Sequence, residues 1–190
     1  MRKKKISITL NSPVVLAFAF ISLIALILGF VTGGVSNTLL FMTYRHTLRD
    51  PLTWIRFFTH TLGHAGWEHY IGNMSYILLL GPVLEEKYGS KKLIWVIVIT
   101  AGITGVLNFI IFPNVALCGA SGVVFAFILL TSFSGFKNGE IPLTFILVAL
   151  IFLGQQVFEG LFVNDNVSQF SHIIGGLVGA GAGYWLNSRH

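Results

Sequence analysis

Long apolar runs, separated by short stretches of Pro, Gly and charged residues, occupy most of this chain. A bilayer core of about 30 Å needs about 20 helical residues at about 1.5 Å per residue. Five of the six runs approach that length, and the fourth is too short. The pattern predicts an all-α membrane protein, a bundle of six transmembrane helices. The runs lie at about 13–32, 67–85, 92–111, 121–133, 141–160 and 168–187.

The composition indicates that lipid is the main solvent of this protein. Of its 190 residues, 54% are apolar and only 10% are charged, whereas soluble domains carry about a quarter charged residues. So few charges cannot cover a water-facing surface. We expect residues 1–190 to form a single membrane domain, with no room for a second one.

The first apolar run has the basic start and apolar body of a signal peptide. Its apolar stretch from Pro13 to Phe30 is longer than the usual signal core of about 7–15 residues, and no small-x-small cleavage site follows it. We therefore expect a retained helix.

Basic residues are divided unequally between the two ends of the predicted helices. The richer end is expected to face the cytoplasm. Six helices then place both termini on that side, and we expect a multi-pass protein of the cell (inner) membrane. The basic residues form no separate face, which argues against a nucleic-acid partner. The richer side holds Arg2, Lys3, Lys4, Lys5, Lys87, Lys91, Lys92, Lys137 and Arg189, and the other side holds Arg45, Arg49 and Arg56.

The segment Cys118-Gly119-Ala120-Ser121-Gly122 opens the short fourth run. A helix from Ser121 to Phe133 spans only about 20 Å, so we expect it to start below the outer membrane surface, after irregular backbone. Irregular backbone at that depth needs protein or water beside it, which predicts a water-filled cavity with Ser121 at its floor. The free N–H groups of a helix N-terminus suit an oxyanion. A small-residue packing motif is the alternative.

His172 lies early in the last run and is followed by small residues at helical spacing. A glycine face lets another helix approach closely, and the short fourth helix has a matching small face. We expect these two helices to pack together and to bring His172 to Ser121. A core histidine bonded to a backbone carbonyl is the alternative. The predicted face consists of His172, Gly176, Gly179 or Ala180, and Gly183, opposite Gly122 and Ala126.

A third polar group precedes and begins the second predicted helix. His69 and Asn73 are four residues apart, so they share a helical face and present N–H donors there. Zinc binding is the alternative, because His60 and His64 have helical ligand spacing, but the glutamate of His-Glu-x-x-His is missing. We expect no metal and no cofactor.

Ser121 and His172 together suggest nucleophilic catalysis. A serine hydroxyl attacks well only after a base takes its proton, and neutral imidazole does this near pH 7. Asp165 is seven residues from His172, in a predicted loop, so we predict a dyad rather than a triad. Hydrogen-bond donors must then stabilise the oxyanion. The expected oxyanion residues are Asn73, His69 and Gly119, with the backbone N–H of Ser121.

In this order and spacing, the motifs resemble those of the rhomboid intramembrane serine proteases in their basic six-helix bacterial form. The resemblance covers about residues 54–186. The family often has Trp directly before the arginine of its first loop, whereas Ile55 follows Trp54 here. The matching segments are Arg56-Phe57-Phe58-Thr59-His60 with His64, His69 and Asn73; Gly81-xxx-Glu85-xxx-Gly89; Gly119-Ala120-Ser121-Gly122; and His172 with Gly175 and Gly176.

The resemblance implies roles that the residues alone do not. Arg56, His64, Glu85 and Gly176 would be structural, and the first loop would lie partly in the outer leaflet. The fifth helix and the Gly160–Gln169 loop would form a gate and cap. Substrates would be single-pass transmembrane proteins, cleaved near a small residue where the helix unwinds, since a helical peptide bond is hydrogen-bonded and shielded.

Two other functions stay open at this point. A catalytically inactive rhomboid-like protein would bind membrane clients, but loss of the serine or the histidine would be its sign, and both are present. A small transporter would carry polar residues along the full membrane depth. Here they gather in the outer halves of the predicted helices, which favours an intramembrane serine endopeptidase.

Overall fold

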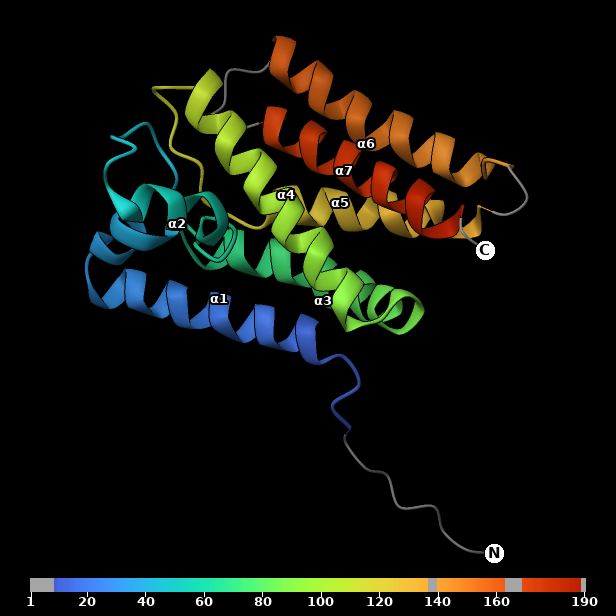
Figure 1. The fold of residues 1–190 in the computed structure, drawn as a ribbon, viewed down its shortest axis with the longest axis horizontal. Coiled ribbons are helices and arrows are strands. Elements are labelled where there is room, and N and C mark those ends of the chain that lie inside the picture. The colour runs from blue at the N-terminus through green and yellow to red at the C-terminus, as the bar shows by residue number, and fades with distance from the viewer. Residues whose placement is uncertain (1–8, 137–139, 163–168, 189–190) are drawn as a thin grey trace, which may run out of the picture.

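The computed structural model describes residues 9–136, 140–162 and 169–188, and this part of the chain is helical, without a β-strand (Figure 1). The prediction of an all-α protein is therefore confirmed. The elements are α1 (Pro13–Val31), the π-helical turn η1 (Asn37–Phe41), α2 (Pro51–Thr59), α3 (Trp67–Tyr88), α4 (Ser90–Ile111), α5 (Ser121–Ser132), the 3-10 turn η2 (Phe133–Gly135), α6 (Leu143–Phe162) and α7 (Gln169–Asn187).

Helices lie at all six positions that the apolar runs predict, with ends that differ by a few residues. Among the described residues, α1 and α4 are long and apolar enough to cross a membrane, with mean hydropathies of 3.0 and 2.3. By the same measure α5 is too short, and α3 carries charged and polar side chains in its first half and in its last turn. The number of six membrane crossings stays a prediction.

The short helix α2 lies in the connection between the first two predicted spans and was not predicted as a helix. Its start is encoded locally. The Asp50 carboxylate accepts a hydrogen bond from the Leu52 N–H at 3.0 Å, and Pro51 occupies the first helical position. Asp is a preferred N-cap residue, and Pro suits the first turn because its missing N–H is not needed there. An Asp-Pro pair in a polar connection was the available signal.

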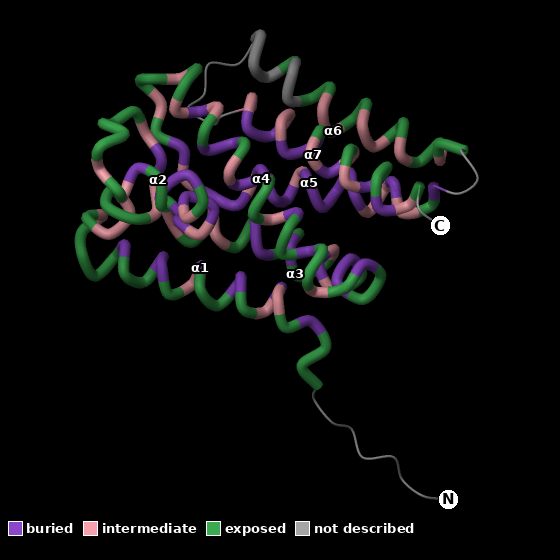
Figure 2. Tube along the Cα trace, viewed as in Figure 1, coloured by how far each residue is buried: buried purple, intermediate pink, exposed green. Residues whose placement is uncertain are grey.

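Helix α5 is the centre of the bundle and packs against α3, α4, α6 and α7 (Figures 1 and 2). Its most extensive contact is with α7. It is apolar on every side and only twelve residues long, and the burial of its side chains shows that protein surrounds it along most of its length. The α5 side chains without solvent exposure are Val123, Ala126, Phe127, Leu129 and Leu130.

Glu85 joins the end of α3 to the start of α1. Its buried carboxylate accepts hydrogen bonds from the N–H groups of Val14 and Val15, each at 3.1 Å. These N–H groups lie in the first turn of α1 and have no partner within that helix. The Ser90 hydroxyl donates to the same carboxylate at 2.7 Å. One acidic side chain thereby fixes the relative position of three helices.

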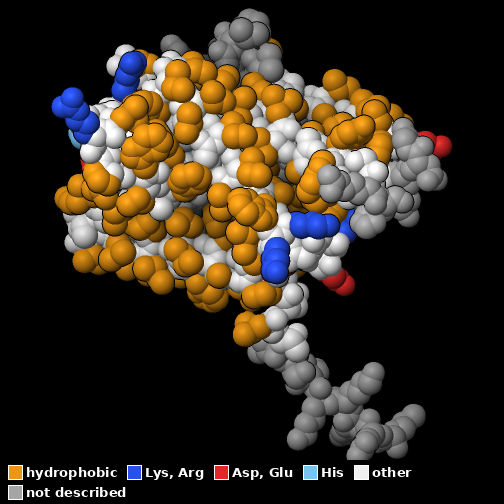
Figure 3. Space-filling view, in the orientation of Figure 1, with side chains coloured by type: hydrophobic (Ala, Val, Ile, Leu, Met, Phe, Trp, Pro, Cys, Tyr) orange, Lys and Arg blue, Asp and Glu red, His pale blue; other side chains and the backbone are white. Residues whose placement is uncertain are grey.

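The outer surface of the bundle is apolar, as a lipid-facing protein requires. Hydrophobic side chains cover the middle of the face shown in Figure 3, and the Lys and Arg side chains lie toward its edges. Large apolar side chains remain exposed on several helices, for instance Ile24 at 57%, Leu79 at 69% and Leu150 at 66%. Water would make such a surface aggregate, whereas a bilayer solvates it.

Candidate active site

Ser121 is the first residue of α5, and His172 lies in the first turn of α7. The Oγ atom of Ser121 and the Nε2 atom of His172 are 2.8 Å apart, a hydrogen-bonding distance. The His172 side chain is 8% exposed, and Ser121 is half-buried. The two residues are 51 positions apart in the chain. Their contact therefore depends on how α5 and α7 pack.

The backbones of α5 and α7 touch at two glycines of α7. A Cβ atom on Gly175 would overlap the carbonyl oxygen of Gly122, and a Cβ atom on Gly179 would overlap the carbonyl oxygen of Ala126. No side chain larger than hydrogen fits at either position without moving a helix. The two helices predicted to pack together do meet, and this close approach places the imidazole beside the hydroxyl.

Gly176 differs from the sequence prediction, which placed it in the row of α7 that faces α5. A Cβ atom there would meet the Leu153 side chain of α6 at 2.6 Å and the Leu129 side chain of α5 at 3.6 Å. The residues that touch the α5 backbone are Gly175 and Gly179 instead. Successive helical residues are about 100° apart, so Gly176 turns toward α6 when Gly175 faces α5.

The ring of Phe125 lies flat against the His172 imidazole. Their ring centroids are 4.6 Å apart and their planes differ by 3°. Phe125 is one helical turn after Ser121 on α5, so the helix that carries the hydroxyl also supports the imidazole. Phe152 of α6 packs edge-to-face with the Phe125 ring, at a centroid distance of 6.1 Å. Phe125 has no distinct signal in the sequence, because it is an apolar residue in an apolar helix.

The chain reaches Ser121 through irregular backbone over residues 112–120, as the sequence predicts. Gly119 has a φ of +133°, and its N–H donates to the His60 carbonyl at 2.9 Å. A Cβ atom on Gly119 would lie 2.5 Å from the His69 ring. Glycine is required here by both the backbone angle and the space. Further back, Thr43 and Leu117 exchange backbone hydrogen bonds of 2.9 and 2.8 Å.

The predicted oxyanion residues gather on one side of Gly119. The His69 ring lies directly against it, and the Asn73 amide nitrogen is 3.7 Å from where a Cβ atom on Gly119 would be. Asn73 is 7% exposed, and its Nδ2 atom is 3.1 Å from Nε2 of His64. The start of α5 adds unpaired N–H groups, as every helix N-terminus does. The structure thus brings Gly119, His69, Asn73 and the start of α5 together.

The hydrogen bonds of His64 determine how it holds Asn73. His64 lies in the connection outside the predicted spans, and burial lowers its pKa to about 4, so the ring is neutral near pH 7. Its Nδ1 atom is 3.2 Å from the Leu62 carbonyl, which can only accept. The single N–H of the neutral ring must therefore be at Nδ1. Nε2 then accepts a hydrogen bond from the Asn73 amide and fixes the amide's orientation.

His60 connects α2 to α4 rather than joining this group. Its Nδ1 atom is 3.2 Å from the Arg56 carbonyl, and its Nε2 atom is 3.3 Å from the Thr104 hydroxyl. The ring is 1% exposed, and burial lowers its pKa to about 4. Its carbonyl receives the Gly119 N–H, so it supports the backbone that leads to Ser121.

Arg56 is buried in the first connection. Its guanidinium donates to the Asp50 carboxylate at 3.1 Å, to the Thr53 hydroxyl at 2.9 Å and to the Leu39 carbonyl at 3.3 Å. It also lies 4.7 Å from the centroid of the Tyr44 ring. Leu48 supplies its carbonyl to the Trp54 indole N–H at 3.1 Å. The hydrogen bonds and ring contact of Arg56 fit the structural role that the resemblance implies for it.

The predicted histidines do not converge as metal ligands. Within the part of the chain that the structure describes, no three His, Cys, Asp or Glu side chains are placed to hold a metal ion. His60 faces Thr104, and His64 faces Asn73.

The predicted Gly160–Gln169 cap lies largely outside the described residues.

Comparison with known proteins identifies the family. The family model of the Rhomboid domain matches residues 51–189. Rhomboid protease GlpG of Haemophilus influenzae is 30% identical over 135 residues, which are 69% of this chain and 68% of that protein. Rhomboid protease GluP of Bacillus subtilis is 27% identical over 188 residues, 94% of this chain and 36% of that protein. Rhomboid-related protein 1 of Caenorhabditis elegans is 32% identical over 140 residues, 68% of this chain and 39% of that protein.

The chain belongs to the rhomboid family. Rhomboid proteins are membrane-embedded, which agrees with the two apolar helices long enough to span a membrane and with the exposed apolar side chains on the outer surface. The chain spans between about a third and two thirds of the length of these curated relatives. Two of the relatives are named as proteases, and these names support an intramembrane protease function for this chain.

Proposed function

We propose that this protein is an intramembrane serine endopeptidase in which Ser121 is the nucleophile and His172 the general base. The single observation that carries the proposal is the 2.8 Å contact between Ser121 Oγ and His172 Nε2 at the start of α5. A half-buried serine and a buried histidine at this distance have the geometry that nucleophile activation requires. Family membership supports the same reaction class.

The catalytic cycle follows from these positions. Nε2 of neutral His172 accepts the Ser121 proton as Oγ attacks the scissile carbonyl, and the imidazolium then protonates the leaving amine. Nε2 then takes a proton from a water molecule whose oxygen attacks the acyl-enzyme carbonyl. The ester bond to Ser121 Oγ breaks, the imidazolium returns the proton to Oγ, and the second product leaves with a carboxyl group. In this proposal the stacked Phe125 ring holds the imidazole in place during these proton transfers.

We assign the oxyanion to the group of hydrogen-bond donors beside Gly119. The backbone N–H of Ser121 and the side chains of Asn73 and His69 supply its hydrogen-bond donors. This group adjoins the nucleophile, because Gly119 is two residues before Ser121 and directly contacts His69. Each such donor is worth about 10²–10³ in rate when it is pre-positioned. His64 acts on this group through Asn73 and also contacts the His69 ring edge-on, with ring centroids 5.1 Å apart.

The expected substrates are single-pass transmembrane proteins, cut where their helix unwinds. Both termini of the protease face the cytoplasm in this proposal, and the α5 and α7 ends that carry Ser121 and His172 face the opposite side. The enclosure of α5 by its neighbours supports a site inside the bundle rather than on its surface. No metal or cofactor takes part in the proposed reaction.

The proposal is tested by labelling the purified protein with a fluorophosphonate probe and locating the modified residue by mass spectrometry. Modification is expected at Ser121 and is lost in Ser121→Ala and His172→Ala, together with cleavage of a reconstituted transmembrane substrate. Ser132→Ala is the matched control, because Ser132 is on the same helix and its hydroxyl only bonds the Ile128 carbonyl at 2.8 Å. Cleavage that persists in Ser121→Ala overturns the assignment.

A further inference from the structure

An apolar groove runs between α4 and α7 on the outside of the bundle. It has a volume of about 620 Å³. Gly181 leaves open space in the groove, because an added Cβ atom there would meet no atom within 4 Å. Two tryptophans stand beside it, Trp95 at 64% and Trp185 at 52% exposure. Its lining includes Lys92, Trp95, Ile99, Ile103, Gly181 and Trp185.

The length of the groove corresponds to one leaflet of a bilayer. From Lys92 to Ile103 the groove follows α4 for eleven residues, which is about 17 Å at 1.5 Å per residue. Half of a hydrocarbon core of about 30 Å is about 15 Å. A transmembrane helix as partner would need the full thickness, so the length favours a single acyl chain.

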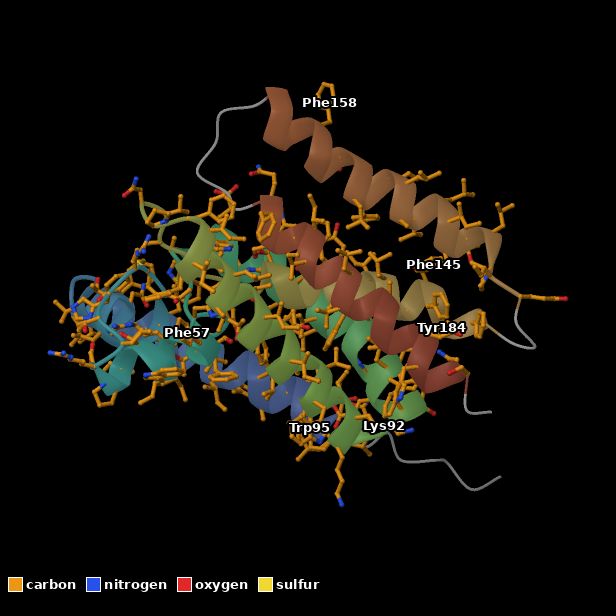
Figure 4. The ribbon with its side chains drawn as sticks, turned by 45° about the horizontal axis from the view of Figure 1, so that its top comes forward. Phe57, Lys92, Trp95, Phe145, Phe158 and Tyr184 are labelled. Atoms are coloured by element: carbon orange, nitrogen blue, oxygen red, sulfur yellow. The ribbon has the colours of Figure 1, made fainter. Side chains whose placement is uncertain are left out.

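The groove has one charged end. Lys92 is exposed and belongs to the lining, and among the described residues no acidic side chain pairs with it. Figure 4 shows Lys92 and Trp95 near each other along the lower edge of the bundle. Lysine and tryptophan at one level mark the headgroup region of a membrane, where the indole ring is partly wet and the ammonium meets lipid phosphate. The apolar body and cationic end together match an anionic phospholipid.

A second apolar groove on the same protein provides a comparison. It lies between α1 and α4, has a volume of about 330 Å³ and is lined by residues such as Val14, Phe18 and Ile97. No charged side chain belongs to its lining. Acyl chains that enter this second groove meet no fixed charge, so their occupancy should not depend on the headgroup.

We propose that the groove between α4 and α7 is a binding site for an anionic phospholipid of the leaflet on the Lys92 side. One acyl chain lies along Ile99 and Ile103 over Gly181, and the phosphate is bound by the Lys92 ammonium. The site is on the opposite side of α7 from the helix α6, and it contains neither Ser121 nor His172. The inference does not depend on the proposed proteolysis.

The test uses the full chain in detergent, titrated with phosphatidylglycerol or phosphatidylcholine and observed by native mass spectrometry. Wild type is expected to retain phosphatidylglycerol preferentially. Lys92→Gln should reduce this preference about fivefold, the effect of one lysine at a membrane surface. Lys91→Gln is the matched control, because Lys91 is a neighbouring exposed lysine outside the lining and its loss should change the preference less.

A second measurement locates the acyl chain. Phosphatidylglycerol with a diazirine in its acyl chain should label peptides of α4 and α7, and Gly181→Leu should suppress that labelling by filling the groove. Gly154→Leu is its control, since Gly154 of α6 also has open space around it and does not line the groove. Labelling unchanged in Gly181→Leu overturns the proposal. So does a preference unchanged in Lys92→Gln, or a crosslink that shows a second copy of the chain or a substrate helix in the groove.

Discussion

Gly179 of α7 lies directly against the backbone of Ala126 of α5, so closely that a Cβ atom on Gly179 would overlap the Ala126 carbonyl oxygen. Gly175 and Gly122 form the same contact one turn nearer to Ser121 and His172. These two contacts set the distance between the helices that carry the hydroxyl and the imidazole. The candidate site therefore depends on residues that have no side chain.

We predict that Gly179→Ala separates α5 from α7, because backbone atoms cannot move aside as a side chain can. Unfolding by sodium dodecyl sulfate in mixed micelles should show a loss of about 1–3 kcal/mol, typical of overpacking. Cleavage should fall more steeply than stability. Gly181→Ala is the control on the same helix, since its Cβ atom would meet nothing, and better helix propensity should keep or raise its stability. Equal effects of the two substitutions would disprove the backbone contact.

Phe125→Ala should lower kcat by about ten- to a hundredfold with little change in KM, because the imidazole loses the ring that holds it and small misplacements cost that much. Phe125→Leu separates the two roles of the ring, since leucine fills the space without offering a flat face. A kcat that stays at the wild-type value in both variants would show that His172 is held by other contacts.

Asn73→Ala should slow cleavage about ten- to a thousandfold, as expected for one oxyanion donor. His64→Ala should slow it less, because it removes no donor: it releases the Asn73 amide from its orienting partner and takes away an edge contact to the His69 ring. The two effects should not add, so the double variant should be no slower than Asn73→Ala alone. An additive double variant would mean that His64 acts independently of Asn73.

Stability should fall as the pH is lowered from about 6.5 to about 4. Burial lowers the pKa of both His60 and His64 to about 4, whereas an unfolded histidine titrates near 6.5. Between these values the unfolded chain binds protons that the folded chain does not, so acid favours unfolding. The contribution of the two neutral histidines to the free energy of unfolding is therefore fully present above pH 6.5 and is lost as the pH falls toward 4. SDS unfolding of the Ser121→Ala protein at several pH values measures it, and His64→Gln should flatten the curve.

That pH series has a built-in check at its acidic end. The pKa of Asp50 is lowered, chiefly by the Leu52 N–H, so its contribution is lost only below its ordinary value of 3.8. A stability loss confined to that range would implicate Asp50 instead of the histidines.

Much of this protein was predictable from local sequence. Uninterrupted apolar runs indicated the long helices, since lipid and helical backbone bonding leave few other solutions. Polar residues in those runs, such as Ser121 and His172, stood out because they are costly there. Their pairing could be inferred because small residues occurred on both helices at helical spacing.

Other features were decided only by the tertiary structure. The choice of Gly175 and Gly179 over Gly176 as the contact row depends on the rotation of α7 about its axis, which packing against both α5 and α6 determines. Phe125 became relevant only when α7 placed an imidazole over it. The sequence alone determined which segments are helical and which polar groups need a partner, because these follow from short-range patterns. The partners themselves were decided by helix rotation and contact between distant segments, which no local pattern encodes.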